Sequence, residues 1–546
     1  MRSLAWTPLF ALAACSPMEG AHDLEPPPAA VVVAASSPAP VASGKPAVVP
    51  ASLVASAAPV APAASARAVV EAPVASAAPV AAKAPAGPRL GSVGRATHIY
   101  AGRNRHVQVG TIRPGTSVAL RSAKPEGGAD CKSGRWYAVE PLGYVCDDLN
   151  VTTDLSSELY RALASLAPRE NEPLPFGYGY STGAPMYDRI PTADEARKAE
   201  RRYQPVEKLH KPKKAGGHME LAQTELPAVT GPVPGFLANH HPAPLMPWQP
   251  EGLVRKTIRE GNLLSFQGVV EGEGGRRFLL ATNLTVVPAD RVWSFRPTSF
   301  HGVELGAAST ATGAPLAWTR RQPRPLHRKD GDRMVATGEN VGPRTAVFLT
   351  GQRTTVGGEE YVESRQGGWL RADQVSTVAA RLDELPSGVD EGERWIDVGL
   401  ASGLLTVYRG HDPVFSTLMS PGAGGTTQSA ALSIEKLLSG AFTPLGLYRM
   451  SFKYRSAVMT PEDTPEPEKS WIDDVPWVMY FRPPYAIHTA YWHEDFGHPK
   501  SGGCVNVSPA DAKYLFESSE PRVPEGWYGA SNNLPDQPGT KIHLHR

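Results

Sequence analysis

Alternating hydrophobic and polar residues predict short β-strands from residue 93 onward. The run HIYAGRNRHVQVGTIRPGTSVALRS at 98–122 has this pattern, and so does GRWYAVEPLGYVC at 134–146. A period of two places successive side chains on opposite faces of a strand. The Gly and Pro residues that interrupt both runs mark turns between strands. The sequence therefore predicts a small all-β unit over 93–153.

This first unit resembles a bacterial SH3-like module. In that resemblance Trp136, Tyr137 and the triplet Gly143-Tyr144-Val145 would lie on the last strands. The implied fold class is mainly β and multi-domain, with SH3-like β-barrel modules followed by a β-rich C-terminal domain.

The middle of the chain, residues 154–380, gives weaker signals. The segment at 192–214 is highly charged and allows either a helix or a solvated linker, of which we favour a helix followed by a linker. The runs at 276–295 and 345–375 predict further β-strands. We expect 154–380 to be a β-rich spacer or further SH3-like modules that serve in binding or spacing. Nothing in this stretch has catalytic spacing.

The N-terminus has the pattern of a targeting segment. Arg2 is followed by an apolar stretch, Leu4–Ala14, that is too short to span a bilayer. The stretch ends in Leu-Ala-Ala-Cys, which resembles a bacterial lipobox and implies that Cys15 is lipidated after removal of the signal peptide. The alternative is an ordinary signal peptide cleaved nearby. Ser16 after the cysteine favours, by resemblance, an outer-membrane lipoprotein that faces the periplasm.

Residues 16–92 are almost entirely Ala, Pro, Val and Ser. Such a composition lacks the large apolar side chains that offset the entropy cost of ordering a chain. We therefore expect a disordered tether, which would hold the folded part away from the membrane and near a target in the cell wall.

Charge and composition exclude one broad class of function. The chain has 546 residues, a formal net charge of +1 and 41% hydrophobic residues. Nucleic-acid binding needs a basic field that no segment carries. The hydrophobic content is sufficient for packed cores in part of the chain.

Four cysteines are present, and two of them lie in the first β-unit. In an exported protein a disulfide between Cys131 and Cys146 is the expected state. A zinc site is the alternative, but it would need two further ligands.

Two histidine pairs also raise the possibility of a metal site. They are His240 with His241, and His543 with His545. Neither pair has an acidic or cysteine partner close by in the sequence, so surface histidines are the preferred interpretation and no metal site is predicted.

Cys504 lies in the polar, glycine-rich run HPKSGGCVNVSP, which we expect to leave it accessible. With Cys15 assigned to lipid and the other two cysteines to a disulfide, it is the unpaired thiol. The run PWVMYFRPPYAIH predicts a pair of strands ending at His488, sixteen residues upstream. An imidazole beside a thiol favours the thiolate, the nucleophile of acyl transfer. Gly502 and Gly503 let backbone N–H groups turn toward a substrate carbonyl.

These motifs resemble the catalytic segment of L,D-transpeptidases, the YkuD-like domain. RWIDVGLASGLLTVYRGHDPVFSTLMSPG resembles its opening hairpin and TPLGLYRM its Thr-Pro-x-Gly segment. The resemblance extends over 388–546. It implies that Cys504 is the nucleophile, His488 the general base and acid, and the carbonyl of Thr489 the group that orients the imidazole.

The resemblance also implies supporting roles. The N–H groups of Gly503 and Cys504 would form an oxyanion hole, with a hydroxyl from Tyr480 or Tyr485. The expected loop and substrate contacts are Ser501 and Asn506, with Trp492 and His493 in a lid between base and nucleophile. The sequence departs from the family at one position, because Gly502 stands where a histidine is usual; His493 or His498 from the lid would then replace that ring.

The implied reaction is attack of the Cys504 thiolate on the bond between diaminopimelate and D-Ala in a peptidoglycan stem tetrapeptide. An amine of a neighbouring stem would resolve the thioester to give a 3→3 cross-link. Water as acceptor would make the protein a carboxypeptidase, and a protein amine would attach a partner to the wall. No cofactor is implied, and carbapenem-type inhibitors are expected to acylate the thiol. The alternative of another class is a non-catalytic, peptidoglycan-binding lipoprotein.

The lipobox can be tested directly. Cys15→Ser should release the protein from the membrane fraction, because the lipid is the only expected anchor. Fractionation of cells followed by immunoblotting measures this. Unchanged partitioning of the variant would contradict the lipid assignment.

Overall fold

The computed structural model describes residues 87–94, 97–209, 219–223, 225–247, 249–305, 315–425, 434–459 and 471–546. All of them fall in one compact unit. The signal peptide, Cys15 and nearly all of the expected tether lie outside the described residues. None of the described helices is long and apolar enough to cross a membrane.

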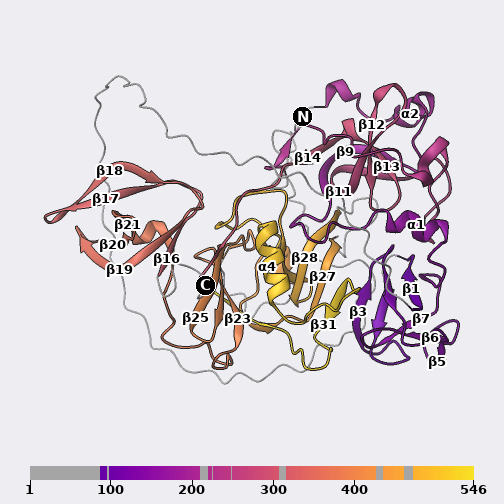
Figure 1. Ribbon diagram of the computed structural model, residues 1–546. Coiled ribbons are helices and arrows are strands. Elements are labelled where there is room, and N and C mark those ends of the chain that lie inside the picture. Colours follow the sequence, from indigo (N-terminus) through magenta and orange to yellow (C-terminus); the bar gives the residue numbers. More distant parts are fainter. Residues whose placement is uncertain are drawn as a thin grey trace, which may run out of the picture. The chain divides into compact units, whose positions relative to one another are not determined.

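The fold is mainly β, as predicted, and strands form most of the ordered elements (Figure 1). In the first half of the chain they are β1 (Arg89–Ser92), β2 (Thr97–Tyr100), β3 (Gln108–Ile112), β4 (Ser117–Ala119), β5 (Glu126–Gly127), β6 (Arg135–Ala138), β7 (Tyr144–Cys146), β8 (Val151–Thr152), β9 (Gly177–Tyr187), β10 (Ala222–Gln223), β11 (Val254–Glu271), β12 (Arg277–Ala281), β13 (Val286–Pro288), β14 (Val292–Phe295) and β15 (Val303–Glu304).

The second half contains β16 (Leu316–Thr319), β17 (Arg324–Asp330), β18 (Arg333–Val341), β19 (Ala346–Val356), β20 (Glu359–Ser364), β21 (Trp369–Arg371), β22 (Val375–Val378), β23 (Arg394–Gly399), β24 (Leu404–Arg409), β25 (Asp412–Leu418), β26 (Gly446–Arg449), β27 (Phe452–Met459), β28 (Ile472–Arg482), β29 (Tyr485–Thr489), β30 (Val505–Val507), β31 (Gly529–Ser531) and β32 (Lys541–His545). The α-helices are α1 (Glu158–Ala164), α2 (Ala193–Glu200), α3 (Ile434–Ser439) and α4 (Pro509–Ser518).

The first β-unit begins earlier than the sequence predicted. Strand β1 pairs with β4 and β8, and its Leu90 is fully buried, so the unit starts at or before Arg89 rather than at residue 93. The boundary was misplaced because the Pro- and Ala-rich composition continues almost up to β1. The predicted disulfide between Cys131 and Cys146 is confirmed.

This β-unit is not an independent domain, because the C-terminal part of the chain completes its core. Strand β3 pairs with β31, and Trp527 and Ala530 pack with Ile99 and Val109. A Cβ at Gly110 would lie 2.2 Å from the Trp527 ring, so this contact requires a glycine. The two ends of the described chain therefore fold against each other.

The predicted charged helix is confirmed as α2. Thr192 caps it, since the Thr192 side chain accepts from the Glu195 N–H and the Glu195 carboxylate accepts from the Thr192 N–H, which forms a capping box. The predicted strands at 276–295 and 345–375 are also confirmed, as β12 to β14 and β19 to β22.

The middle of the chain does more than space the other parts. Strand β11 pairs with β28 through Leu263 and Ile472, and β15 adds to the edge of the C-terminal sheet beside β25. The Gly302 N–H also donates to the buried carboxylate of Asp511 at 2.7 Å. The middle of the chain is therefore packed together with the C-terminal domain, because residues before 388 supply strands and hydrogen bonds to it.

Two sheets frame the C-terminal domain. One has the strand order β15-β25-β24-β23-β32-β26, and the other runs through β28, which pairs with β29, which in turn pairs with β30. Between them lies a core that contains Ile396, Met479, Ile487 and Val505. Helix α4 packs on this core beside β28 (Figure 1). Its Phe516 ring lies 5.3 Å from that of Trp477.

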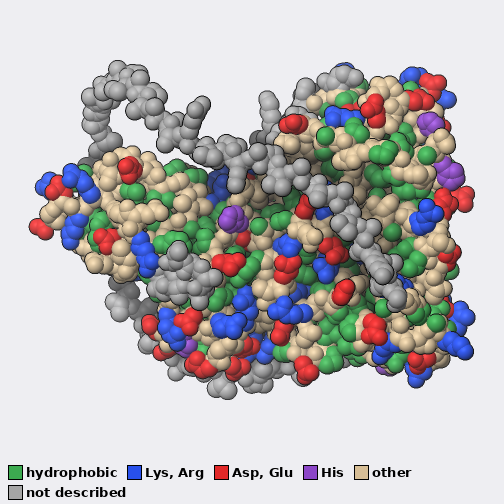
Figure 2. Space-filling view, in the orientation of Figure 1, with side chains coloured by type: hydrophobic (Ala, Val, Ile, Leu, Met, Phe, Trp, Pro, Cys, Tyr) green, Lys and Arg blue, Asp and Glu red, His purple; other side chains and the backbone are tan. Residues whose placement is uncertain are grey.

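The charged side chains follow the balanced composition. Acidic and basic groups are interspersed on the face in view, with no large field of a single sign (Figure 2).

Candidate active site

The predicted base and nucleophile lie on two neighbouring strands. Strands β29 and β30 pair in parallel, with His488 opposite Asn506. The same register sets Cys504, one residue before β30, opposite Ala486. Because side chains alternate between faces, Cys504 and His488 point to the same side of the sheet, on diagonal positions with their Cα atoms ~8 Å apart from strand spacing and rise. Two side chains at that separation can meet.

The imidazole of His488 is buried and held in one tautomer. It is 2% exposed, and its Nδ1 lies 2.8 Å from the backbone oxygen of Thr489. A carbonyl oxygen only accepts, so Nδ1 carries the proton and Nε2 keeps its lone pair. Burial lowers the pKa of His488 to about 4, although the hydrogen bond to Thr489 opposes this shift. The ring is therefore a neutral base at pH 7.

Cys504 is far less accessible than its polar loop suggested. It is 1% exposed, because it leads into β30 and packs with Tyr480, Ala486 and Trp492. Its Sγ lies 3.4 Å from the Ala486 N–H. The expectation of an unpaired thiol is also wrong here: the sulfur is disulfide-bonded. The nucleophile that the resemblance implies is thus the reduced form.

Ser501 makes two hydrogen bonds within the loop of residues 501–504, which carries Cys504. Its hydroxyl donates to the carbonyl oxygen of Cys504 and accepts from the Gly503 N–H at 3.0 Å. The predicted oxyanion role of Gly503 does not fit this arrangement, because its N–H is already donated to Ser501. Gly503 is nevertheless required to be a glycine. Its φ is +133°, and a Cβ there would lie 2.6 Å from the ring of Tyr485.

Thr443 is a loop-positioning residue that we did not predict. Its hydroxyl donates to the Gly503 carbonyl at 2.8 Å and accepts from the Gly422 N–H at 2.8 Å. It is the threonine of the Thr-Pro-x-Gly segment, so the motif was visible but its role was not. The contact joins residues sixty positions apart, which sequence spacing does not reveal.

The two tyrosines proposed for the oxyanion hole lie on opposite faces of the sheet. Tyr480 pairs with Ala486 across β28 and β29 and belongs to the same buried cluster as Cys504. Tyr485 instead packs in the core on the other face with Ile487. Burial raises its pKa to about 12. Tyr480 is therefore the candidate on the side of the nucleophile.

Trp492 and His493 form a packed wall rather than an exposed lid. They are 4% and 0% exposed, and the Trp492 ring lies 6.1 Å from that of His488. Nδ1 of His493 accepts from the Asp495 N–H at 3.2 Å. Nε2 of the same ring lies 3.2 Å from Nδ2 of the Asn506 side-chain amide, so the ring contacts Asn506 directly.

This contact distinguishes the two histidines considered as replacements for the ring missing at Gly502. His493 reaches Asn506, the residue opposite His488. His498 is a third exposed and lies 3.6 Å from an Asp495 carboxylate oxygen. Only His493 is thus placed beside the catalytic strands.

Ion pairs from the middle of the chain hold the segment between base and nucleophile. Arg296 donates to both carboxylate oxygens of Glu494, at 3.2 and 3.3 Å, and Arg344 lies 3.5 Å away. Further along, Lys500 donates to Glu220 at 2.5 Å. The segment is therefore fastened from outside the C-terminal domain.

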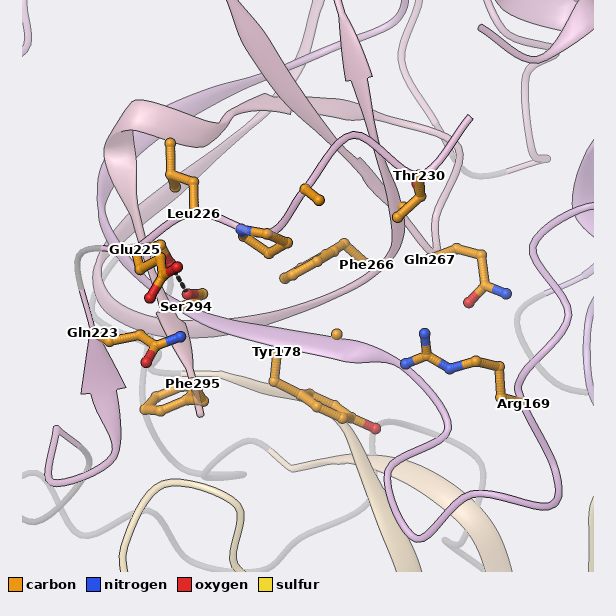
Figure 3. Close-up of a pocket in the computed structure, with 14 residues that line it drawn as sticks. Arg169, Tyr178, Gln223, Glu225, Leu226, Thr230, Phe266, Gln267, Ser294 and Phe295 are labelled. Carbon is orange, nitrogen blue, oxygen red and sulfur yellow. Dashed lines mark hydrogen bonds between the residues drawn. The ribbon is translucent and has the colours of Figure 1, made fainter. Parts of the chain in front are cut away.

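A cavity of about 390 Å³ lies beside the same segment (Figure 3). Arg169, Tyr178, Phe266 and Phe295 are among the residues that line it, and neither Cys504 nor His488 is. The Tyr178 ring stacks on Tyr491 with centroids 4.0 Å apart. The cavity thus lies next to Tyr491, but the candidate nucleophile and base do not line it.

The two histidine pairs differ in their surroundings. Nδ1 of His240 lies 3.0 Å from the Ile190 carbonyl, and Nδ1 of His241 lies 4.0 Å from a carboxylate oxygen of Glu158. No metal-type cluster among the described residues includes either histidine. His543 and His545, in contrast, both contact Asp397. The expectation that this pair lacks an acidic partner is wrong, because Asp397 lies on a neighbouring strand although it is distant in sequence.

Residues 393–543 match a family model, YkuD, described as the L,D-transpeptidase catalytic domain. The chain is similar to the L,D-transpeptidase of Xylanimonas cellulosilytica, with 20% identity over 30% of this chain and 65% of that one, and a TM-score of 0.19. It is similar to an Enterococcus faecium L,D-transpeptidase mutant, with 18% identity over 28% of this chain and 50% of that one, and a TM-score of 0.19.

The E. faecium catalytic domain acylated by ertapenem gives 18% identity over 29% of this chain and 100% of that one, with a TM-score of 0.20. The chain thus spans two thirds or less of the first two relatives. No curated protein matches it. The family match covers residues 393–543, the C-terminal part of this chain.

The buried state of His488 predicts a pH dependence. Its folded pKa of about 4 lies below the ordinary 6.5, so the unfolded chain binds a proton first as the pH falls. The free energy of unfolding should then decrease by about 1.4 kcal/mol per pH unit between 6.5 and 4 from this group. NMR titration of the ring measures the pKa, and His488→Gln should remove that slope. A ring that titrates near 6.5 would contradict the prediction.

Proposed function

We propose that the C-terminal domain is a cysteine acyltransferase acting on peptidoglycan stem peptides, an L,D-transpeptidase. The observation that carries this proposal is the parallel pairing of β29 with β30, which sets Cys504 and a neutral His488 on one face of the sheet. The family match supports the reaction class.

The reaction begins as Nε2 of His488 takes the proton of the reduced Cys504 thiol during the attack of its sulfur. The sulfur attacks the carbonyl carbon of diaminopimelate, the C–S bond forms, and the bond to the D-Ala nitrogen breaks. The imidazolium returns its proton to the leaving amine. An amine of a neighbouring stem then attacks the thioester, its proton passes to His488, and the C–S bond breaks to give the 3→3 cross-link and the thiol.

Water or a protein amine as acceptor gives the two related outcomes, carboxypeptidase action and attachment of a partner. The acceptor is selected after the thioester has formed, so all three share the first step. The β-units before residue 388, including the SH3-like one, would present the domain to the wall.

One observation favours a second candidate, a non-catalytic domain that binds stem peptides. Cys504 and His488 are 1% and 2% exposed. A substrate therefore reaches them only after the aromatic wall of Tyr491 and Trp492, or the loop 501–504, has moved. A domain that never opens would bind at its surface without reacting.

Covalent trapping distinguishes the two. Reduced wild-type protein should form one carbapenem adduct by intact mass, and Cys504→Ala should form none, because the attacking sulfur is gone. His488→Gln should slow acylation by at least about 100-fold, the usual contribution of a general base. His498→Gln is the matched control and should acylate at the wild-type rate. Reduced wild-type protein that binds peptidoglycan but forms no adduct with a carbapenem or a stem tetrapeptide would establish the non-catalytic alternative.

Gly502→His tests the departure from the family. Since His493 already places an imidazole beside Asn506, restoring the usual histidine should change the acylation rate by less than about tenfold, or about 1.4 kcal/mol in the barrier. The companion variant His493→Gln should be slower than wild type. A much larger gain in Gly502→His would mean that the natural loop is impaired and that His493 does not compensate.

A further inference from the structure

Strand β32 presents two imidazoles on one face. His543 and His545 are two residues apart, so the alternation of a strand points both the same way. The neighbouring strand β23 runs parallel to β32 and sets Asp397 opposite His543. In Figure 1 the C-terminus, which follows β32, lies beside β23. The pairing thus brings two histidines and one carboxylate together.

The three side chains converge on a small volume. Nδ1 of His543 lies 3.1 Å from one oxygen of Asp397, and Nε2 of His545 lies 2.9 Å from the other. The three candidate ligand atoms all lie within 4.8 Å of one another. A tetrahedral ion with bonds of about 2.0 to 2.1 Å separates its ligands by roughly 3.3 Å, so only small side-chain movements would admit it.

The two rings are also arranged in parallel. Their centroids lie 5.1 Å apart with an angle of 17° between the planes. His545 keeps 43% of its side chain exposed, whereas His543 and Asp397 keep 29% and 23%. One side of the cluster therefore faces solvent and leaves room for a further ligand.

This cluster is separate from the candidate active site. The alternate residues of the same strands, Ile396 and Val398 on β23 and Ile542 on β32, face the core that contains Ile487 of β29. Asp397 and the histidines lie on the opposite face of that sheet. The core thus stands between the cluster and His488.

Lys541, the cation on β32, does not pair with the Asp397 carboxylate. It donates to Asp390 at 3.0 Å and to Glu393 at 2.7 Å. Its charge is therefore compensated by two other carboxylates, and Asp397 stays available to the histidines.

We propose that Asp397, His543 and His545 bind a divalent ion of the zinc class, with a fourth position open to water. Two imidazoles and one carboxylate are ligands that this ion accepts, and three protein ligands with an open position form a recognised type of zinc site. The bound ion would join β32 to β23 and so stabilise the six-stranded sheet against unfolding.

Metal titration of the full chain, stripped with a chelator, tests the proposal. One equivalent of Zn²⁺ should bind, measured by calorimetry, and should raise the melting temperature. Co²⁺ serves as a spectroscopic probe, and its visible absorption should report a four-coordinate site. Asp397→Asn and His545→Gln should each weaken Zn²⁺ binding by more than about tenfold, since even the loss of an outer-shell partner costs that much.

His411→Gln is the matched control. His411 lies 3.2 Å from the carboxylate of Glu391, a histidine and carboxylate pair with no second histidine. This variant should bind Zn²⁺ as the wild type does. If Asp397→Asn fails to fold, the partly exposed His545→Gln decides the matter. Absence of a bound equivalent, or binding that His545→Gln leaves unchanged, would overturn the proposal and leave a purely hydrogen-bonded cluster.

Discussion

The parallel pairing of β29 with β30 is the constraint on which the candidate site depends. It sets the base and the nucleophile on one face through backbone hydrogen bonds alone, before any side-chain contact is made. Both strands are buried, and the backbone of Asn506 also bonds in both directions to that of Ser420. A register shift of one residue would turn Cys504 toward the opposite core and separate it from His488. The relative positions of the candidate base and nucleophile are therefore set by the strand register and not by the loop 501–504.

Burial in the sheet has a consequence for the base. A charged imidazole is costly to bury, so His488 stays neutral, and its bond to the Thr489 carbonyl leaves Nε2 as the basic nitrogen. A preformed ion pair of thiolate and imidazolium is disfavoured under these conditions. In the proposed reaction the proton would therefore pass during attack, and the imidazolium would persist only until the leaving amine accepts its proton.

Local pattern was sufficient to predict the strand pair that ends near His488, the helix capped by Thr192 and the disulfide between Cys131 and Cys146. Each depends on residues near in sequence or on a general property of exported proteins. The sequence failed where long-range packing decides. Cys504 is buried because distant strands cover it, although its own loop is polar. The partnership of Asp397 with His543 likewise spans 146 residues and follows only from the sheet order.

Contacts from the middle of the chain contribute to the free energy that would be needed to expose the candidate site. The ion pairs to Glu494 are partly exposed, and pairs of that kind contribute little. The aromatic contacts are different, because Tyr491 stacks on Tyr178 and Trp492 is almost fully buried. Exposing such rings costs on the order of 2 kcal/mol each. In the proposed function, access to Cys504 would therefore depend mainly on the packing of Tyr491 against β9, a strand from the part of the chain expected to be a β-rich spacer or further SH3-like modules.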